Sequence, residues 1–235
     1  MNLYGLQKVT LLDFPGHVAC TVFTGGCDFR CPYCHNFQLA SATGPAQISE
    51  EQFFSFLKSR LGRLDGVAVT GGEPCLHPGL PDFLKKIKAL GFQTKLDTNG
   101  FHPEMLRAVL KAGLADYVAM DIKAAPWNYA RAVGLPSVDL APIHESVSIL
   151  LSGGTDYEFR TTVVKEIHST EDFYSIGPWI QGATRYFLQP FVSRSSVPCL
   201  GLHAPERETL EACLRAVRLF VPSASLRGVE YHPSV

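Results

Sequence analysis

The sequence predicts an α/β fold, specifically a partial (β/α)6 TIM-like barrel that forms a single domain over residues 1–235. Apolar runs of strand length alternate six times with stretches of helical periodicity, and such repeated units imply a parallel sheet with right-handed crossovers. Six units fall short of the eight that close a barrel, so we expect the barrel to be open. No Ser/Gly-rich linker divides the chain, which indicates one domain.

Capping residues mark the boundaries of several expected elements. Ser49 stands three residues before Gln52, the spacing of a capping box, and so begins the first helix. Pro103 and Gly113 bracket the third helix in the order that helix ends prefer. The expected strands are 18–23, 66–70, 92–100 with its turn, 116–123, 157–164 and 185–190, with a last short strand at 226–231. The expected helices are 50–62, 80–91, 103–113, 141–151, 171–180 and 205–220.

The composition is that of a globular protein and disfavours several classes of function. Hydrophobic residues make up 46% of the chain, charged residues make up 18%, and the net charge is −1. Without a basic excess we expect no nucleic-acid partner, and without a long apolar run or a signal peptide we expect no membrane partner and a cytoplasmic location. In a reducing cytoplasm the seven cysteines are better interpreted as thiols or metal ligands than as disulfides.

Polar residues gather where the expected strands end. In a parallel sheet the carboxyl ends of the strands meet at one edge, and the chemistry is usually located in the loops that follow them. The cysteine loop CDFRCPYCHN follows the first strand, and Arg160 lies within the fifth. The remaining strands end in TGGEP, DTNG, DIK and LQP. Unrelated loops would not all place polar residues at the same end of the strands, so we expect one site at this edge.

The cysteine loop places three thiols within eight residues. Cys27, Cys31 and Cys34 can bring three sulfurs to one side of a tight loop, and three thiolates could hold three irons of a [4Fe–4S] cluster while the fourth iron stays open. The alternative is a structural zinc ion with His35 as the fourth ligand. Because His35 directly follows Cys34, and adjacent residues rarely converge on one small ion, the cluster is favoured.

The Cys-x3-Cys-x2-Cys loop after a first strand resembles that of the radical S-adenosylmethionine (radical SAM) superfamily. The longer string FTGGCDFRCPYCHN resembles the activating enzymes of glycyl radical enzymes, namely those of pyruvate formate-lyase and of anaerobic ribonucleotide reductase. The opening segment GLQKVTLLDFPGHVACTVFTGGC is similar to the second group, the anaerobic ribonucleoside-triphosphate reductase activating proteins. The resemblance runs from about Tyr4 through Arg160 and weakens after that.

The resemblance implies a set of cofactors and a reaction. In the family, SAM chelates the open iron of the [4Fe–4S] cluster, and an electron cleaves it to methionine and a 5′-deoxyadenosyl radical. Here that radical would take a hydrogen atom from a glycine of a partner, a glycyl radical enzyme. The other cysteines lack tight spacing, and Cys20 and Cys213 are expected in the core. One cluster is therefore expected, and its electron would come from an outside flavodoxin- or ferredoxin-type donor.

By the same resemblance, two residues of the cysteine loop and one glycine-rich turn would contact SAM. Tyr33 would pack beside the adenine, although a loop aromatic that covers the core is the alternative. Asn36 would form a hydrogen bond near the carboxylate of SAM, where a plain turn residue is the alternative. The turn formed by Gly71, Gly72 and Glu73 would contact the amino group of SAM, mostly through its backbone.

Ionisable groups on the next three strands would surround the carboxylate of SAM. By resemblance, Asp97, Thr98 and Asp121 would help to hold a monovalent cation, and Lys123 would contact the ligand or the partner. A salt bridge between Asp121 and Lys123, two residues apart on one strand face, is the alternative. Arg160 would meet the carboxylate of SAM, and the alternative places it at a strand edge facing water.

The sixth strand departs from the family pattern. Activating enzymes of pyruvate formate-lyase have a histidine shortly after a Leu-Leu-Pro, whereas this chain reads LQPFV with Val192 at that place. Gln189 could supply the polar contact instead. The departure argues against pyruvate formate-lyase as the partner. Two other functions stay open: a radical SAM enzyme acting on a small molecule or modified nucleotide, and a zinc-stabilised interaction domain without catalysis.

Overall fold

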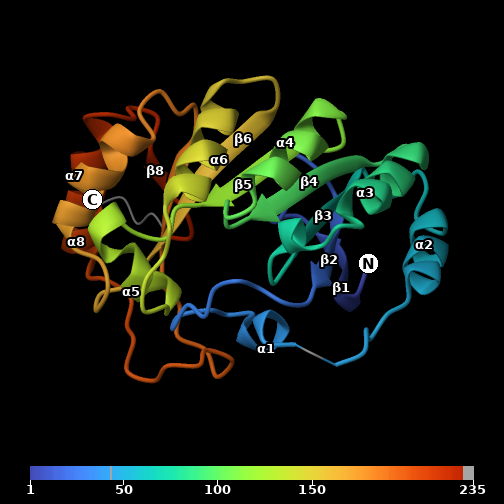
Figure 1. The fold of residues 1–235 in the computed structure, drawn as a ribbon, viewed down its shortest axis with the longest axis horizontal. Coiled ribbons are helices and arrows are strands. Elements are labelled where there is room, and N and C mark those ends of the chain that lie inside the picture. Colours follow the sequence, from blue (N-terminus) through green and yellow to red (C-terminus); the bar gives the residue numbers. More distant parts are fainter. Residues whose placement is uncertain (43, 230–235) are drawn as a thin grey trace, which may run out of the picture.

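The computed structural model describes residues 1–42 and 44–229. It shows a single α/β domain built on one eight-stranded sheet in which every strand lies beside its neighbours in the chain, from β1 to β8 (Figure 1). β1 runs antiparallel to β2, and all later pairs are parallel. The strands are β1 Leu3–Thr10, β2 Ala19–Thr24, β3 Gly66–Gly71, β4 Gln93–Thr98, β5 Tyr117–Asp121, β6 Asp156–Val163, β7 Tyr186–Pro190 and β8 Ser225–Leu226.

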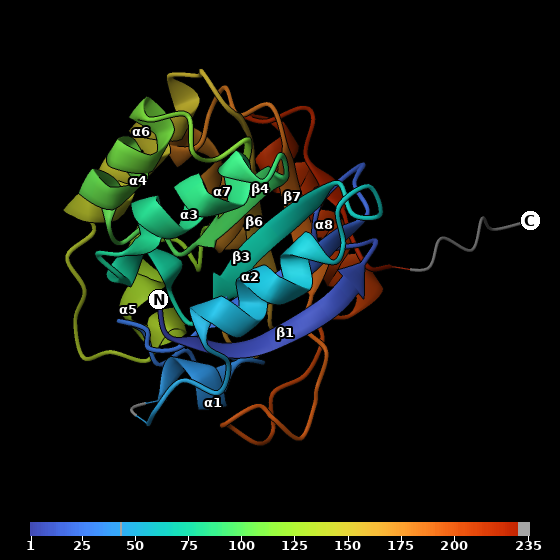
Figure 2. The ribbon, with the colours of Figure 1, turned by 90° about the vertical axis from the view of Figure 1, so that its right-hand side faces the viewer.

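The long helices cover the outer face of the curved sheet, and its inner face is left to line the barrel (Figures 1 and 2). The α-helices are α1 Phe37–Ala40, α2 Glu50–Lys58, α3 Leu80–Ala89, α4 Pro103–Lys111, α5 Tyr129–Val133, α6 Ala141–Leu151, α7 Thr170–Trp179 and α8 Arg207–Arg218. Two 3-10 turns, η1 Pro74–Leu76 and η2 Pro126–Asn128, follow β3 and β5. The prediction of six consecutive β/α units in an open barrel is confirmed.

Several predicted boundaries need correction. β1 was not predicted, because its burial does not alternate: three exposed residues follow one another at 7–9, and its pairing with β2 contains register shifts. α1 and α5 are four and five residues long, too short for periodicity to show them. α2 ends at Lys58 instead of Gly62, because turns occupy the residues after it. The last strand is Ser225–Leu226, and part of the range predicted for it, from 230 on, lies outside the described residues.

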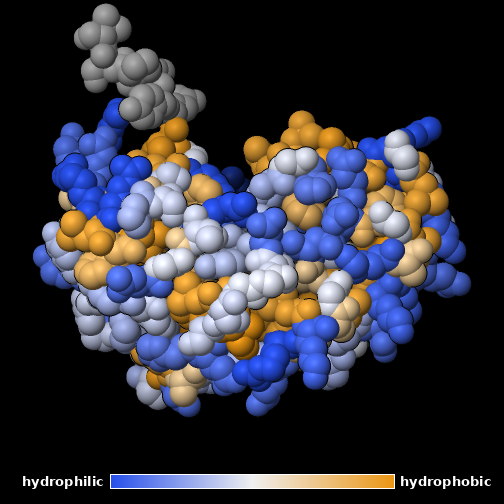
Figure 3. Space-filling view, turned by 90° about the horizontal axis from the view of Figure 1, so that it is seen from above, coloured by the Kyte–Doolittle hydropathy of each residue, from blue (hydrophilic) through white to orange (hydrophobic). Residues whose placement is uncertain are grey.

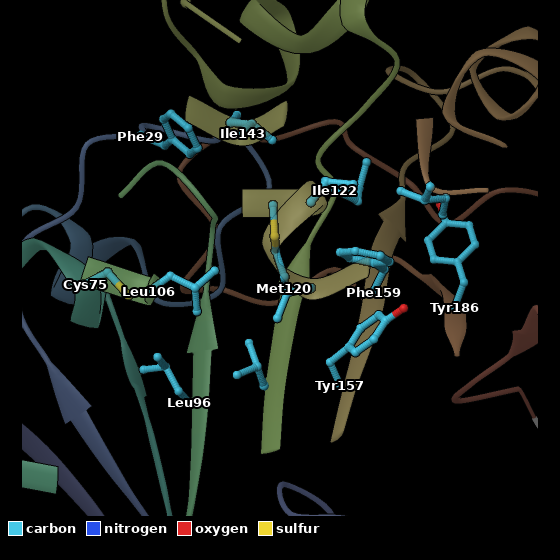
Figure 4. Packing of buried hydrophobic residues seen from close by; sticks show 14 of the residues in the cluster. Phe29, Cys75, Leu96, Leu106, Met120, Ile122, Ile143, Tyr157, Phe159 and Tyr186 are labelled. Atoms are coloured by element: carbon cyan, nitrogen blue, oxygen red, sulfur yellow. The ribbon is translucent and has the colours of Figure 1, made fainter. Parts of the chain in front are cut away.

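The main hydrophobic core lies between the outer face of the sheet and the helices. Leu96, Met120 and Phe159 on three neighbouring strands pack with Leu106 of α4 and Ile143 of α6 (Figure 4). Side chains alternate between the two faces of a strand, so the next residue along each of these strands points into the barrel instead. The core therefore fixes which polar residues, namely Asp97, Asp121 and Arg160, face inward.

Cys20 and Cys213 are fully buried in this core, as predicted. The cysteine loop lies at the lower end of the molecule in Figure 1, beside α1. The opposite end shows hydrophilic side chains with hydrophobic groups scattered among them (Figure 3). None of the helices within residues 1–42 and 44–229 has the length and apolar character that a membrane span requires.

The predicted capping box of α2 is present. The Oγ atom of Ser49 accepts a hydrogen bond from the Gln52 backbone N–H at 3.1 Å, and Gln52 Oε1 accepts from the Ser49 backbone N–H at 2.9 Å. We expect Ser49→Ala to lower the free energy of unfolding by about 1 kcal/mol, because it leaves an N-terminal amide of the helix without its partner. Urea unfolding of the protein measures this.

Ser55→Ala is the matched control for the cap. Ser55 is exposed inside the same helix, where alanine is the better helix former, so this variant should not lose stability. Equal unfolding midpoints for Ser49→Ala and the unaltered protein would contradict a stabilising cap.

Candidate active site

A cavity of about 420 Å³ lies at the carboxyl ends of the strands. Its walls include every predicted site residue except Gln189, namely Cys27, Cys31, Tyr33, Cys34, Asn36, Gly71, Gly72, Glu73, Asp97, Thr98, Asp121, Lys123 and Arg160. Gln189 is partly buried on β7, where it pairs with Thr162 of β6, a residue that does line the cavity. The structure thus brings together residues that are separated by up to 133 positions in the chain.

Neighbouring elements clamp the cysteine loop through backbone hydrogen bonds. Gly26 N–H donates to Leu39 at 2.9 Å, and Arg30 N–H donates to Val133 at 2.8 Å. The Glu73 N–H donates to the Gly26 carbonyl at 2.8 Å, which joins the loop to the turn after β3. A Cβ atom on Gly72 would lie only 1.9 Å from that same carbonyl oxygen, so this close approach requires glycine.

Glu73 is buried and connects the end of β3 to the end of β4 through hydrogen bonds. Its side chain is 1% exposed and accepts hydrogen bonds from Thr98 Oγ1 at 2.8 Å, from the Asn99 N–H at 2.7 Å and from the Cys75 N–H at 2.9 Å. Burial raises the pKa of this carboxyl group, and the three donors oppose the rise. The carboxylate is therefore committed to partners within the protein.

The three thiols of the loop line one cavity and lie near the ammonium group of Lys123. Burial raises the pKa of Cys27 to about 12 and that of Cys31 to about 11, and it also raises the pKa of Cys34. Lys123 acts in the opposite direction on all three. Burial thus favours the protonated form of the thiols, and a metal that binds here would have to displace those protons.

The donor set fits a [4Fe–4S] cluster. Each thiolate would bind a different iron, so the three sulfurs need not converge on one point. Within residues 1–42 and 44–229 no group of three or more His, Cys, Asp or Glu side chains could hold a single metal ion. His35, the fourth ligand of the zinc alternative, is engaged elsewhere: its Nε2 donates to the Val192 carbonyl at 2.6 Å, and its ring stacks on Phe191.

Five ionisable side chains form one connected network on the inner face of the sheet. Lys95 pairs with Asp97, and Arg160 Nη1 lies 3.5 Å from the second oxygen of that carboxylate. Arg160 Nε donates to Asp121 Oδ1 at 2.9 Å, and Lys123 Nζ donates to Asp121 Oδ2 at 2.8 Å. Three cations face two carboxylates within this network, and Asp13 and Glu73 add further carboxyl groups to the wall of the same cavity.

The network keeps its members charged. Burial alone would raise the pKa of Asp97, but Lys95 and Arg160 outweigh it and hold that pKa below its usual value. Burial opposes ionisation of Asp121 too, yet Arg160 and Lys123 lower its pKa further. The same carboxylate raises the pKa of Lys123 against the effect of burial. The alternative salt bridge between Asp121 and Lys123 is therefore present, whereas Arg160 is 16% exposed in the interior and does not face water at an edge.

Tyr33 and Asn36 lie where they can support both the loop and a ligand. Tyr33 is buried in the core cluster and also lines the cavity, and its hydroxyl donates to the Lys123 carbonyl at 3.4 Å. His168 Nδ1 accepts from the Val164 N–H at 3.0 Å, so its Nε2 carries the proton and donates to the same carbonyl at 2.8 Å. Asn36 Nδ2 donates to the Gly71 carbonyl at 3.3 Å.

The cavity also includes residues that the sequence analysis did not select. Gln7 and Asp13 come from β1 and the loop after it, and Asp13 Oδ2 accepts from Thr21 Oγ1 at 2.5 Å. They could not be placed because β1 was not predicted. Asn99 also lines the cavity and directly follows Thr98 in the DTNG turn. Its place beside a selected residue was the one feature of the sequence that could have indicated it as a site residue.

Comparison with known proteins finds relatives along most of the chain. A protein of Methanocaldococcus jannaschii, named as a glycyl-radical enzyme activating enzyme, is 29% identical over 193 residues, covering 80% of this chain and 78% of its own. The pyruvate formate-lyase-activating enzyme of Clostridium pasteurianum is 33% identical and covers 52% of each chain. The anaerobic ribonucleoside-triphosphate reductase-activating protein of Escherichia coli is 31% identical over 38% of this chain and 60% of its own.

Solved structures share the fold. Methylornithine synthase superposes with a TM-score of 0.64 at 15% identity, covering 88% of this chain and 63% of that one. The sequence model of the Radical SAM superfamily matches residues 21–172, which contain the three thiols, the GGE turn and the charged network. The chain belongs to the radical SAM superfamily.

Proposed function

We propose that this protein is an activating enzyme that generates the radical of a glycyl radical enzyme. The observation that carries the proposal is the convergence on one cavity of three thiols from one loop and a charged network that includes Lys123 and Arg160. The relative from Methanocaldococcus jannaschii, which matches this chain along most of both lengths, supports the same activity.

The chain's residues divide into those for the cluster and those for SAM. Cys27, Cys31 and Cys34 would hold the [4Fe–4S] cluster, and the ammonium group of Lys123 favours the thiolate form of all three. The chemistry that the two cofactors supply is reductive cleavage of SAM to methionine and a 5′-deoxyadenosyl radical. Arg160 and Lys123 would orient the carboxylate of SAM through charge-assisted hydrogen bonds.

The remaining predicted contacts belong to the same binding mode. Tyr33 would lie by the adenine, Asn36 near the carboxylate and the Gly71–Glu73 turn by the amino group. Gln189, which points to the same side of the sheet as Thr162, would take the polar role that a histidine has in activating enzymes of pyruvate formate-lyase. A monovalent cation at Asp97, Thr98 and Asp121 would have to share carboxylates that already pair with protein cations.

The partner we propose is anaerobic ribonucleotide reductase. Two features support it: the similarity of the opening segment up to Cys27, and the LQPFV run without the histidine. Of the four cysteines outside the loop, Cys20, Cys75 and Cys213 are buried and Cys199 is exposed, and we propose a single cluster. The electron would accordingly come from an outside flavodoxin- or ferredoxin-type protein.

The test is carried out anaerobically with the reconstituted protein, a reductant, SAM and the candidate reductase. We expect a glycyl radical signal in the electron paramagnetic resonance (EPR) spectrum of the reductase, which requires SAM and disappears when its radical glycine is replaced by alanine. A parallel sample contains pyruvate formate-lyase.

Each outcome decides between named functions. A radical that forms on pyruvate formate-lyase alone would show that the proposed partner is wrong and that the proposed activating function is right. Cleavage of SAM with neither partner activated, together with turnover of a small molecule, would favour the small-molecule alternative. A protein that takes up zinc and no cluster would overturn the proposal.

A further inference from the structure

The loop between β4 and α4 aims an amide group at one of the three thiols. Asn99 Nδ2 lies 3.7 Å from Cys27 Sγ, and Asn99 is 6% exposed. The same sulfur accepts the Phe29 backbone N–H at 3.4 Å. Cys27 is thus a sulfur with two N–H donors, one of which comes from a side chain on another strand end.

Two hydrogen bonds fix the orientation of the Asn99 amide. Its Oδ1 accepts from the Phe101 N–H at 2.9 Å, which leaves Nδ2 as the atom directed at the sulfur. The backbone N–H of Asn99 donates to Glu73 Oε2 at 2.7 Å, and Glu73 is itself held by further donors. The side chain therefore cannot exchange its oxygen and nitrogen without losing a bond.

Further contacts between the β4–α4 loop and the cysteine loop hold the Asn99 amide beside Cys27. The Phe101 ring lies 5.3 Å from that of Phe29, centroid to centroid. His102 Nε2 lies 2.8 Å from Asp28 Oδ2. Three of the four residues from 99 to 102 thus contact three consecutive residues of the cysteine loop, 27 to 29.

We propose that Asn99 raises the reduction potential of the [4Fe–4S] cluster through its N–H···S hydrogen bond to Cys27. Reduction adds negative charge to the cluster and its thiolates, so a donor to one sulfur stabilises the reduced form more than the oxidised form. The inference rests on the cluster that superfamily membership implies and not on the identity of the partner.

Asn99→Asp should give the largest shift, and the charge-neutral variant Asn99→Ala is the decisive one. Aspartate keeps the shape of the side chain and the oxygen that accepts from Phe101, but it replaces the donor with a second oxygen and adds a negative charge, which lowers the potential by itself. We expect the ratio of reduced to oxidised cluster at a fixed potential to fall at least about tenfold, which is about 59 mV for one electron. Asn99→Ala, which removes the donor without adding charge, should shift the potential in the same direction by less.

The measurement is an EPR-monitored redox titration of the reconstituted protein, with no partner present and with iron and sulfide contents checked. Phe101→Leu is the control: it alters the packing of the same loop and keeps the backbone N–H that orients Asn99. Its potential should match that of the unaltered protein.

Two results would overturn the proposal. One is an unchanged potential in a fully loaded Asn99→Ala protein. The other is an equal shift in Phe101→Leu, which would make Asn99 a merely structural residue. If Asn99→Ala does not take up the cluster, Asn99→Leu, which is also neutral and has no donor, decides by the same criterion. Because no partner is present, failure here is distinguishable from failure of the proposed activation.

Discussion

Cys31→Ala is expected to abolish formation of 5′-deoxyadenosine. Cys31 is the middle thiol of the loop, and a set of three ligands has none to spare once the fourth iron is left open. The variant should take up less iron and sulfide on reconstitution. Cleavage of SAM by the reduced variant should fall to the background of the assay. Cleavage by Cys31→Ala at an undiminished rate would contradict the assignment of the site.

Cys213→Ala is the matched control. This thiol is fully buried in α8 among core residues, away from the cavity. The substitution removes only a sulfur atom from the core, so cluster content and SAM cleavage should persist. Loss of cleavage here would refute the interpretation of Cys213 as a packing residue.

Asp121→Asn is expected to lower the free energy of unfolding at neutral pH by about 1.5 to 3 kcal/mol, because the carboxylate is partly buried and accepts charge-assisted hydrogen bonds. Its carboxylate accepts from both Arg160 and Lys123, and its removal leaves three cations, of which Lys95 is buried and the other two are partly buried, around the single carboxylate of Asp97. Asparagine has nearly the same shape, so the change reports charge and not packing. Urea unfolding of the protein without cofactors measures it.

The effect of Asp121→Asn should depend on pH. Because the network lowers the pKa of Asp121 in the folded protein, the ionised group stabilises the fold above its unfolded-state pKa of about 3.9. That contribution disappears as the pH falls through the lower, folded-state value. The gap between the two proteins should therefore be widest near pH 7 and should narrow in strong acid.

Asp156→Asn provides the comparison for a surface pair. Asp156 lies 3.5 Å from Arg185, and both side chains are largely exposed. Solvent screens such a pair, so its loss should change the stability by no more than about 1 kcal/mol. Equal losses in Asp121→Asn and Asp156→Asn would show that the inner network does not stabilise the fold.

The sequence predicted the parallel part of the fold because burial on both faces leaves a strong pattern. Strands such as β3 and β5 are short apolar runs between glycines or charged residues, and the helices between them, α3 and α4, both have a proline in their first turn. β1 escaped prediction because an edge strand with one face partly in water and shifted register has no such pattern. α5 is set by tertiary contacts, among them the bond between Val133 and Arg30.

The location of the site could be predicted because the carboxyl ends of parallel strands meet at one edge of a sheet. The inward direction of Asp97, Asp121 and Arg160 follows from alternation, but their partner Lys95 was passed over as part of an apolar strand. A lysine with 2% exposure contradicts the usual preference of that residue for water, and only the neighbouring carboxylate explains it. Asn99 was missed because an asparagine before glycine is most often a turn residue.

The order of the strands in the sheet has a consequence for synthesis of the chain. Since each strand lies beside the one made just before it, the sheet can grow in step with translation, without waiting for a distant strand. The cysteine loop is made early, whereas Arg160 follows Cys34 by 126 residues, roughly 6 to 25 s at bacterial and other cellular rates of about 5 to 20 residues per second. During that interval the three thiols are present but the charged network lacks Arg160. A cluster assembled in that time would be surrounded by the complete network only after β6 has joined the sheet.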